Sequence, residues 1–277
     1  MHNLTRLSLP LGFLLFLSLT NSSLSSFINH KLNTQSIQTR TLSDQVITTC
    51  QHPNTFAITY DDGPYDFQNN ISDHLSSHNV HGTFFVNGNN WDCIYDPKIV
   101  RLLKHTFAQG HLIGSHTWSH PNISTLNADQ LNLQLELVEI ALKKILGVIP
   151  RYFRPPYGSY NEQNLQVLLK RGYKVINWSF DSGDSSGVSA QDTKKAYKTL
   201  SEQTPITPQI SLNHETHSST AFDVTPYAVN VLQKVGYRLV SVSECLGLGT
   251  SLSDYYQYVG KPTERDDSWT CNGTPSP

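Results

Sequence analysis

Two adjacent carboxylates, Asp61 and Asp62, follow the apolar run 56–60 and are the first candidates for chemistry in this sequence. Gly63 and Pro64 come next and favour a sharp turn. Adjacent carboxylates repel each other, so holding both ionised at the end of a buried strand requires a nearby cation. The alternative is that the two residues only cap a following helix.

Two histidines, His116 and His120, come after another apolar run, four positions apart. Such a pair lies on one face of a helical turn, so both imidazoles could reach one ion. With Asp62 they supply two nitrogens and one oxygen, which is the open ligand set of a catalytic zinc site. We therefore expect Zn²⁺, although Co²⁺ or Mn²⁺ suits the same ligands. Because the chain has 12 histidines, a chance pair on the surface is the alternative.

A third polar segment runs from Arg154 through two prolines to Tyr157. The prolines fix the backbone and leave the Tyr157 N–H as a candidate oxyanion donor, unless the loop is merely rigid.

Two further polar segments are Asp181 to Asp184 and Leu212 to Glu215. A histidine after a strand suits a general acid, and a carboxylate from a neighbouring loop would raise its pKa and keep it protonated. His217 is a competing candidate, which we expect to make a surface or secondary substrate contact.

The elements that must position these residues are short β-branched and aromatic runs. They recur roughly every 25 to 40 residues, the length of a strand plus a crossover helix. Seven such units predict a parallel α/β barrel, in which the loops after the strands build the active site. The runs are 56–60, 83–86, 112–114, 152–154, 173–180, 209–213 and 238–242.

Helical segments lie between these runs. Asn127 and Gln130 form a capping-box start, and Gly147 ends an amphipathic helix. Residues 164–170 and 227–234 are apolar helical segments that end shortly before a glycine.

The length of 277 residues with 38% hydrophobic composition is typical of one large domain. Residues 1–20 combine a basic start with a short apolar stretch, which predicts a signal peptide cleaved within 20–26 and a secreted or cell-wall protein. An uncleaved anchor is the alternative. We expect a polar arm over 21–47, the catalytic barrel over 48–247 and an extension over 248–277. No further apolar stretch is long enough for a membrane span.

The formal net charge of −2 gives no footprint for nucleic acid, so we expect a neutral partner. We also expect a monomer. Four cysteines predict two disulfides, for which three pairings exist. Cys50 precedes the first core run and Cys245 follows the last, so our hypothesis is Cys50 with Cys245 and Cys93 with Cys271. Glycosylation sequons occur at Asn70, Asn122, Asn177 and Asn272, and Asn177 lies in a strand-like run where we expect it to be inaccessible.

Taken together, the motifs T-Y-D-D-G-P, S-H-T-W-S-H, R-P-P-Y, D-S-G-D and L-N-H resemble those of the polysaccharide deacetylase family, carbohydrate esterase family four. The sequence is most similar to the secreted fungal chitin deacetylases, from about residue 48 to 247. This resemblance implies a distorted TIM-like barrel of seven or eight βα units. It also implies metal-dependent release of acetate from N-acetylglucosamine residues in chitin or chitin oligosaccharides.

The resemblance also assigns roles to matching residues and supports the pairing of Cys50 with Cys245. Asp62, His116 and His120 would bind the metal ion. Asp61 would be the base, oriented by Arg154, and the Tyr157 N–H would donate to the oxyanion. His214 would be the acid, paired with Asp184, and Leu212 would contact the acetyl methyl group.

Two positions depart from the family pattern. Tyr60 replaces the usual phenylalanine, and its side chain should point into the barrel wall. Ser185 and Ser186 follow Asp184 where an aromatic residue is usual, so Trp91, Trp118 or Tyr157 would have to provide a stacking surface for the sugar. Acetylated xylan and peptidoglycan are alternative substrates, and a catalytically silent glycan-binding protein is a third alternative.

Overall fold

The computed structural model describes residues 42–277, so the expected signal peptide and residues 21–41 of the expected arm lie outside it. Residues 42–47, which we had placed in the arm, form the 3-10 helix η1 (Leu42–Gln45) and strand β1 (Val46–Ile47). Strand β1 pairs in parallel with β8 (Lys174–Ile176), so the sheet begins before residue 48. Within the described range no helix is both long and apolar enough to cross a bilayer.

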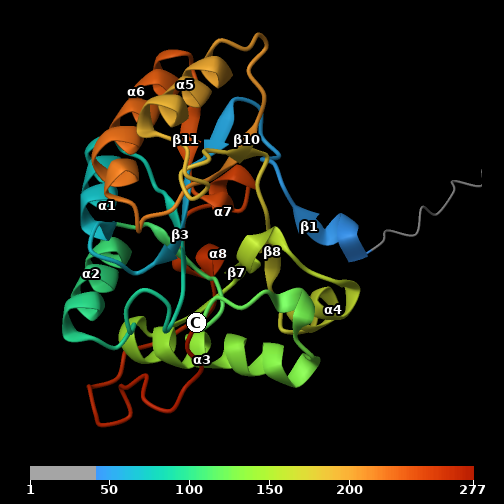
Figure 1. Ribbon diagram of the computed structural model, residues 1–277, viewed down its shortest axis with the longest axis vertical. Coiled ribbons are helices and arrows are strands. Elements are labelled where there is room, and N and C mark those ends of the chain that lie inside the picture. The colour runs from blue at the N-terminus through green and yellow to red at the C-terminus, as the bar shows by residue number, and fades with distance from the viewer. Residues whose placement is uncertain (1–41) are drawn as a thin grey trace, which may run out of the picture. The chain divides into compact units, whose positions relative to one another are not determined.

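Parallel strands alternate with helices along the chain, as the spacing of the apolar runs predicted (Figure 1). The remaining strands are β2 (Thr55–Ala57), β3 (Thr59–Gly63), β4 (Thr83–Val86), β5 (Leu112–Ser115), β6 (Val148–Pro150), β7 (Tyr152–Phe153), β9 (Phe180–Asp181), β10 (Gln209–Leu212), β11 (Arg238–Val240) and β12 (Tyr256–Val259). The α-helices are α1 (Gln68–Ser77), α2 (Pro97–Ala108), α3 (Ala128–Leu146), α4 (Glu162–Lys170), α5 (Ala190–Ser201), α6 (Thr225–Lys234), α7 (Val242–Cys245) and α8 (Leu252–Tyr255). Shorter turns are η2 (Ile123–Thr125), η3 (Pro156–Gly158) and the π-helix η4 (Thr220–Val224).

Ten of the twelve strands in the described range form two parallel sheets that together make the expected distorted barrel. One sheet has the order β1-β8-β7-β5-β4-β3 and the other β11-β2-β10-β9. Only Ile58 separates β2 from β3, and a parallel bridge between Asp61 and His214 also links the sheets. The carboxyl ends of β3 and β10 therefore meet at one place.

We had expected one strand over the run 173–180, but the structure has two. Strand β8 belongs to the first sheet and β9 to the second, because the backbone N–H of Asn177 donates to Ile47 and that of Ser179 donates to Ile210. The break leaves Trp178 between the two sheets, at the carboxyl end of β8.

Helix α3 has the predicted ends. At its start the Asn127 side chain accepts from the Gln130 backbone N–H, and the Gln130 side chain accepts from the Asn127 backbone N–H. At its end Gly147 has a left-handed backbone with φ of 79°. Leu131, Leu135 and other apolar residues on one face are buried, so α3 serves as scaffold.

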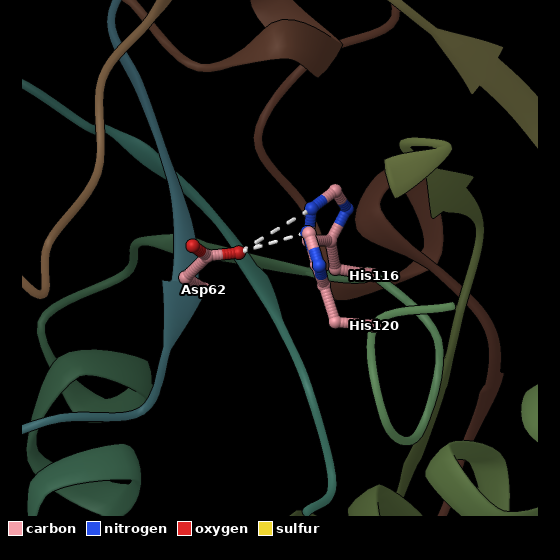
Figure 2. A group of neighbouring side chains, drawn as sticks. All are labelled: Asp62, His116 and His120. Carbon is pink, nitrogen blue, oxygen red and sulfur yellow. Dashed lines mark ion pairs between the residues drawn. The ribbon is translucent and has the colours of Figure 1, made fainter. Parts of the chain in front are cut away.

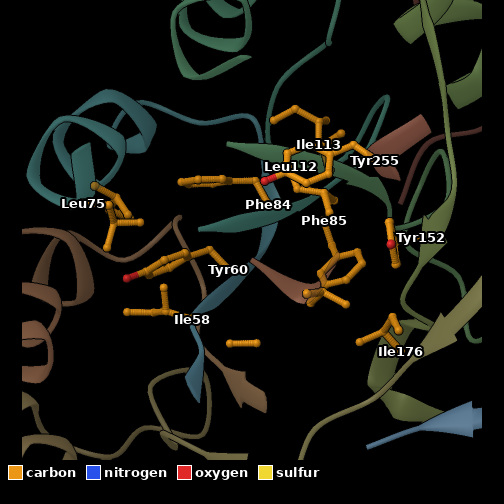
Figure 3. Close-up of a cluster of buried hydrophobic side chains, with 14 of the residues drawn as sticks. Ile58, Tyr60, Leu75, Phe84, Phe85, Leu112, Ile113, Tyr152, Ile176 and Tyr255 are labelled. Carbon is orange, nitrogen blue, oxygen red and sulfur yellow. The ribbon is translucent and has the colours of Figure 1, made fainter. Parts of the chain in front are cut away.

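The core lies between the strands and the helices that cover them (Figure 3). All four residues of β4 are buried, as expected for a parallel strand covered on both faces. The ring of Phe84 stacks on Tyr60 at 5.4 Å, and the Tyr60 hydroxyl pairs with Thr225 Oγ1 at 2.9 Å. Tyr60 therefore points into the wall, as predicted for this departure from the family pattern.

Both predicted disulfides are present, Cys50–Cys245 and Cys93–Cys271. The second belongs to the extension after residue 247, which packs against the domain. Strand β12 pairs antiparallel with β6, and Trp269 is buried against the core.

We predict that Phe84→Ala lowers the free energy of unfolding by about 3–5 kcal/mol, because a fully buried ring is lost and a cavity remains. Urea denaturation measures this change. The matched control is Phe222→Ala: this side chain is 58% exposed and contacts Phe67, so the loss should be about 1 kcal/mol or less. Equal losses for the two variants would contradict this account of the core.

Candidate active site

Strand β3 delivers Asp61 and Asp62 to the carboxyl end of the barrel. The Asp61 side chain is buried. The backbone of Asp62 has φ of 73°, a left-handed conformation that non-glycine residues seldom adopt. Gly63 follows in close contact with Glu215, since a Cβ at Gly63 would lie 1.7 Å from Glu215 Oε1. The turn therefore needs glycine at position 63.

His116 and His120 lie on an irregular loop after β5, so the predicted helical turn is wrong. Thr117 and His120 have left-handed backbone conformations, with φ of 70° and 57°. These conformations turn the loop back on itself, so that the centres of the two imidazole rings lie 5.0 Å apart. Both rings face Asp62 (Figure 2). The distances to Asp62 Oδ1 are 3.6 Å from His116 Nε2 and 3.2 Å from His120 Nε2.

These three side chains fit a divalent cation. One ligand atom from each lies within 4.8 Å of the others, and Asp62 Oδ1 is buried without a hydrogen-bond partner. His116 Nδ1 bonds to the Arg154 carbonyl at 2.7 Å, so Nδ1 carries the proton and the Nε2 lone pair faces Asp62. Burial lowers the pKa of both histidines and favours the neutral form that coordinates metal.

Asp61 is held by a buried arginine rather than by the histidines. Arg154 Nη1 donates to Asp61 Oδ1 at 2.8 Å and to Thr59 Oγ1 at 2.7 Å, and its guanidinium lies 4.4 Å over the Phe85 ring. Burial raises the pKa of Asp61 to about 6, although the Arg154 charge opposes the rise. A carboxylate that titrates near neutrality can exchange protons with a reacting group.

His214 and Asp184 form a second ion pair. His214 Nδ1 lies 2.7 Å from Asp184 Oδ1, and the His214 N–H and the Thr220 hydroxyl both donate to Asp184 Oδ2 at 2.7 Å. Burial lowers the pKa of His214, but the Asp184 hydrogen bond and charge, with Asp61 and Asp62, raise it to about 9. The imidazole is therefore protonated at neutral pH and holds a proton that it can donate.

One cavity of about 430 Å³ brings most of the predicted residues together. Trp178 also lines it and was missed, because the run 173–180 was interpreted as one strand. A tryptophan directly after a strand was the available signal. The complete lining is Asp61, Asp62, His116, His120, Tyr157, Trp178, Asp181, Ser185, Ser186, Leu212 and His214.

The structure separates the proposed stacking residues. Tyr157 lines the cavity and is 68% exposed, whereas Trp118 is 1% exposed and so cannot stack on a sugar. Trp91 is half-exposed beside Tyr65 but lies outside the cavity lining. His217 also lies outside it, with its ring 6.1 Å from that of His214.

We predict that Asp184→Asn lowers the pKa of His214 from about 9 toward its ordinary value or below. The substitution removes the charge that raises the pKa and leaves burial, which lowers it. Titration of the His214 ring by NMR measures this shift. Asp181→Asn is the matched control, since this exposed carboxylate accepts from the Gly183 N–H instead, and should leave the value near 9. An unchanged titration in Asp184→Asn would contradict the pairing.

The chain is similar in sequence and structure to known deacetylases. Residues 48–176 match the family described as Polysaccharide deacetylase. A chitin deacetylase of Pestalotiopsis sp is 39% identical over 238 residues, which cover 84% of this chain and 76% of the relative. The chitin deacetylase of Colletotrichum lindemuthianum is 37% identical over 205 residues, which cover 72% and 82%. The solved structure of a chitin deacetylase from that fungus aligns with a TM-score of 0.72 at 33% identity, covering 76% of this chain and 95% of that one. On these similarities and on its fold, the chain belongs to the polysaccharide deacetylase family, carbohydrate esterase family four.

Proposed function

We propose that this deacetylase removes the acetyl group from N-acetylglucosamine residues of chitin or chitin oligosaccharides, giving acetate and chitosan. One observation carries the proposal: a single cavity is lined by the Arg154-bound Asp61, by three side chains that fit a metal ion and by the protonated His214. Two disulfides fit a protein of an oxidising compartment, and we propose that it is secreted and acts outside the cell or in the cell wall.

Asp62, His116 and His120 would hold the metal ion, with Zn²⁺ as the first choice and Co²⁺ or Mn²⁺ as alternatives. When bound, such an ion polarises the acetyl carbonyl and lowers the pKa of water.

Asp61 takes the proton from the water that attacks the acetyl carbon. Arg154 holds Asp61 Oδ1, which leaves Oδ2, 3.8 Å from His116 Nε2, to receive that proton. We further propose that the Tyr157 N–H donates to the developing oxyanion and that Leu212 contacts the acetyl methyl group.

His214 completes the reaction. It donates its proton to the amide nitrogen as the carbon–nitrogen bond breaks, so the amine leaves neutral and the acetyl group leaves as acetic acid, which ionises to acetate in water. The proton that Asp61 took from the water then passes to His214, which restores both residues. Asp184 stabilises the protonated imidazole before this transfer.

Chitin is favoured because both fungal relatives described above are named chitin deacetylases. Peptidoglycan is a second candidate, since a peptidoglycan-N-acetylglucosamine deacetylase of Bacillus cereus is 38% identical over 135 residues. Those residues cover 48% of this chain and 47% of that relative, so the argument for peptidoglycan is weaker. Acetylated xylan would depend less on His214, because an alkoxide leaves more readily than an amide nitrogen.

We predict that Asp61→Asn lowers the rate of acetate release from chitin oligomers by about 100-fold to 10,000-fold, because the base is lost. Asp66→Asn is the matched control: Asp66 is exposed, pairs with Lys98 and should keep the wild-type rate. A normal rate in Asp61→Asn would overturn the assignment of the base.

We predict a similar contrast between two neighbouring histidines. His214→Asn should lower acetate release from chitin oligomers by about 100-fold or more, whereas His217→Asn should change it only slightly. An equal loss in both variants would contradict the choice of His214 as the acid.

A chelator should abolish acetate release by the wild type, and added Zn²⁺ should restore it.

The substrate is tested by comparing acetate release from chitin oligomers, acetylated xylan and peptidoglycan at equal acetyl concentration. We predict the highest kcat/KM for chitin oligomers of defined length, with products that mass analysis shows to be lighter by whole acetyl groups. A higher value for peptidoglycan would overturn chitin as substrate and retain the reaction. Chelator-resistant glycan binding without acetate release would instead indicate a silent binding protein.

A further inference from the structure

We propose that the C-terminal tail, defined as Cys271–Pro275, supports the metal site by holding Trp118 in the loop that carries His116 and His120. Trp118 and Thr274 are then positioning residues. The inference rests on the proposed function, because it assumes that Asp62, His116 and His120 bind a metal ion. It gives the extension after residue 247 a role in the reaction.

The ligand loop, residues 116–120, needs support from its surroundings. Thr117 and His120 both have the left-handed backbone that residues with a Cβ seldom adopt. Trp118 lies midway between the two histidines and is almost fully buried. Its position therefore determines the direction in which the chain leaves His116 and enters His120.

The backbone of Trp118 is fixed from two sides. Its N–H donates to Gln134 Oε1 of α3 at 2.9 Å, and its carbonyl accepts from the N–H groups of Gly88 at 2.9 Å and Asn89 at 2.7 Å. The indole ring lies directly on Gly88, where a Cβ would be 1.8 Å from the ring.

The tail binds the remaining polar edge of this residue. Trp118 Nε1 donates to Thr274 Oγ1 at 2.9 Å, while the Thr274 hydroxyl donates to the Cys271 carbonyl at 2.7 Å. Asn89 Nδ2 donates to the Pro275 carbonyl at 2.9 Å. The tail thus bonds both to the indole of Trp118 and to Asn89, the residue next to Gly88 under the indole ring.

The disulfide Cys93–Cys271 closes this arrangement covalently. The backbone of Cys93 also forms an isolated antiparallel β-bridge with that of Asn89, the residue that bonds to both Trp118 and the tail. Without the disulfide no covalent bond links the tail to the segment that carries Asn89 and Cys93. Loss of the disulfide should let the tail move away, so that the indole N–H of Trp118 loses Thr274 as its acceptor. The ligand loop can then relax, and metal binding must order it again.

The experiment measures the affinity of the full chain for Zn²⁺ and Co²⁺ by competition with a chromophoric chelator. It is done at a temperature well below the melting temperatures of the wild type and of all variants. The variants are Cys93→Ser with Cys271→Ser, and Thr274→Val, which keeps the disulfide. We expect the dissociation constants to rise about tenfold or more, as is typical when support of metal ligands is removed.

Two matched controls separate positioning from stability. Cys50→Ser with Cys245→Ser removes the other disulfide, which joins the segment before β2 to α7, and should lower the melting temperature without changing metal affinity. Thr263→Val changes an exposed threonine of the same extension and should change neither.

Unchanged metal affinity in both the Thr274 and the Cys93–Cys271 variants would overturn the inference while leaving the proposed function intact. An equal loss of affinity in both disulfide variants would also overturn it, since general destabilisation would then explain the effect. A wild-type chain that binds neither ion would overturn the proposed metal site, and this inference with it.

Discussion

The site depends on keeping two adjacent carboxylates ionised at the buried end of one strand. Burial and the neighbouring Asp62 charge raise the pKa of Asp61, so Asp61 needs a positive partner to stay ionised. Arg154, itself fully buried, supplies that partner for Asp61. Asp62 turns away through its left-handed backbone toward the two imidazoles, where a cation would complete the balance. One strand end therefore serves two different tasks, since Asp61 can accept a proton while Asp62 binds an ion.

The same strand end is also tied to the opposite side of the site. The Asp61 N–H donates to Asn213 at 2.8 Å, and the Glu215 N–H donates back to Asp61 at 3.2 Å. The residue between these partners is His214, so the spacing between proposed base and proposed acid is determined by backbone hydrogen bonds rather than by flexible side chains. The buried Glu215 carboxylate fills the space beside Gly63 and accepts from the Tyr65 N–H at 3.0 Å. This packing leaves little freedom for the loop that carries Asp61 and Asp62.

Much of this arrangement could be predicted from the sequence, because its signals are local. Apolar runs separated by helical segments predicted the parallel sheets, and polar residues at strand ends predicted which side chains meet. Three features could not be predicted, since tertiary contacts decide them. The loop between His116 and His120 is not helical, because contacts to Trp118 stabilise left-handed residues that nothing in the sequence identifies. The run 173–180 has no glycine or proline to mark its break. Thr274 lies in a polar tail whose partner Trp118 is 156 residues away.

The central claim is that neighbouring Asp61 and Asp62 have separate roles, one as base and one as ligand. The most direct test is to determine the zinc content and zinc dissociation constant of purified Asp61→Asn and Asp62→Asn beside the wild type. Asp61→Asn should bind zinc with the wild-type stoichiometry, because Asp61 is held by Arg154 at 2.8 Å and is not one of the three proposed ligands. Asp62→Asn should lose most of its zinc, because it lacks the one carboxylate of the ligand set. Loss of zinc from Asp61→Asn equal to that from Asp62→Asn would contradict the account.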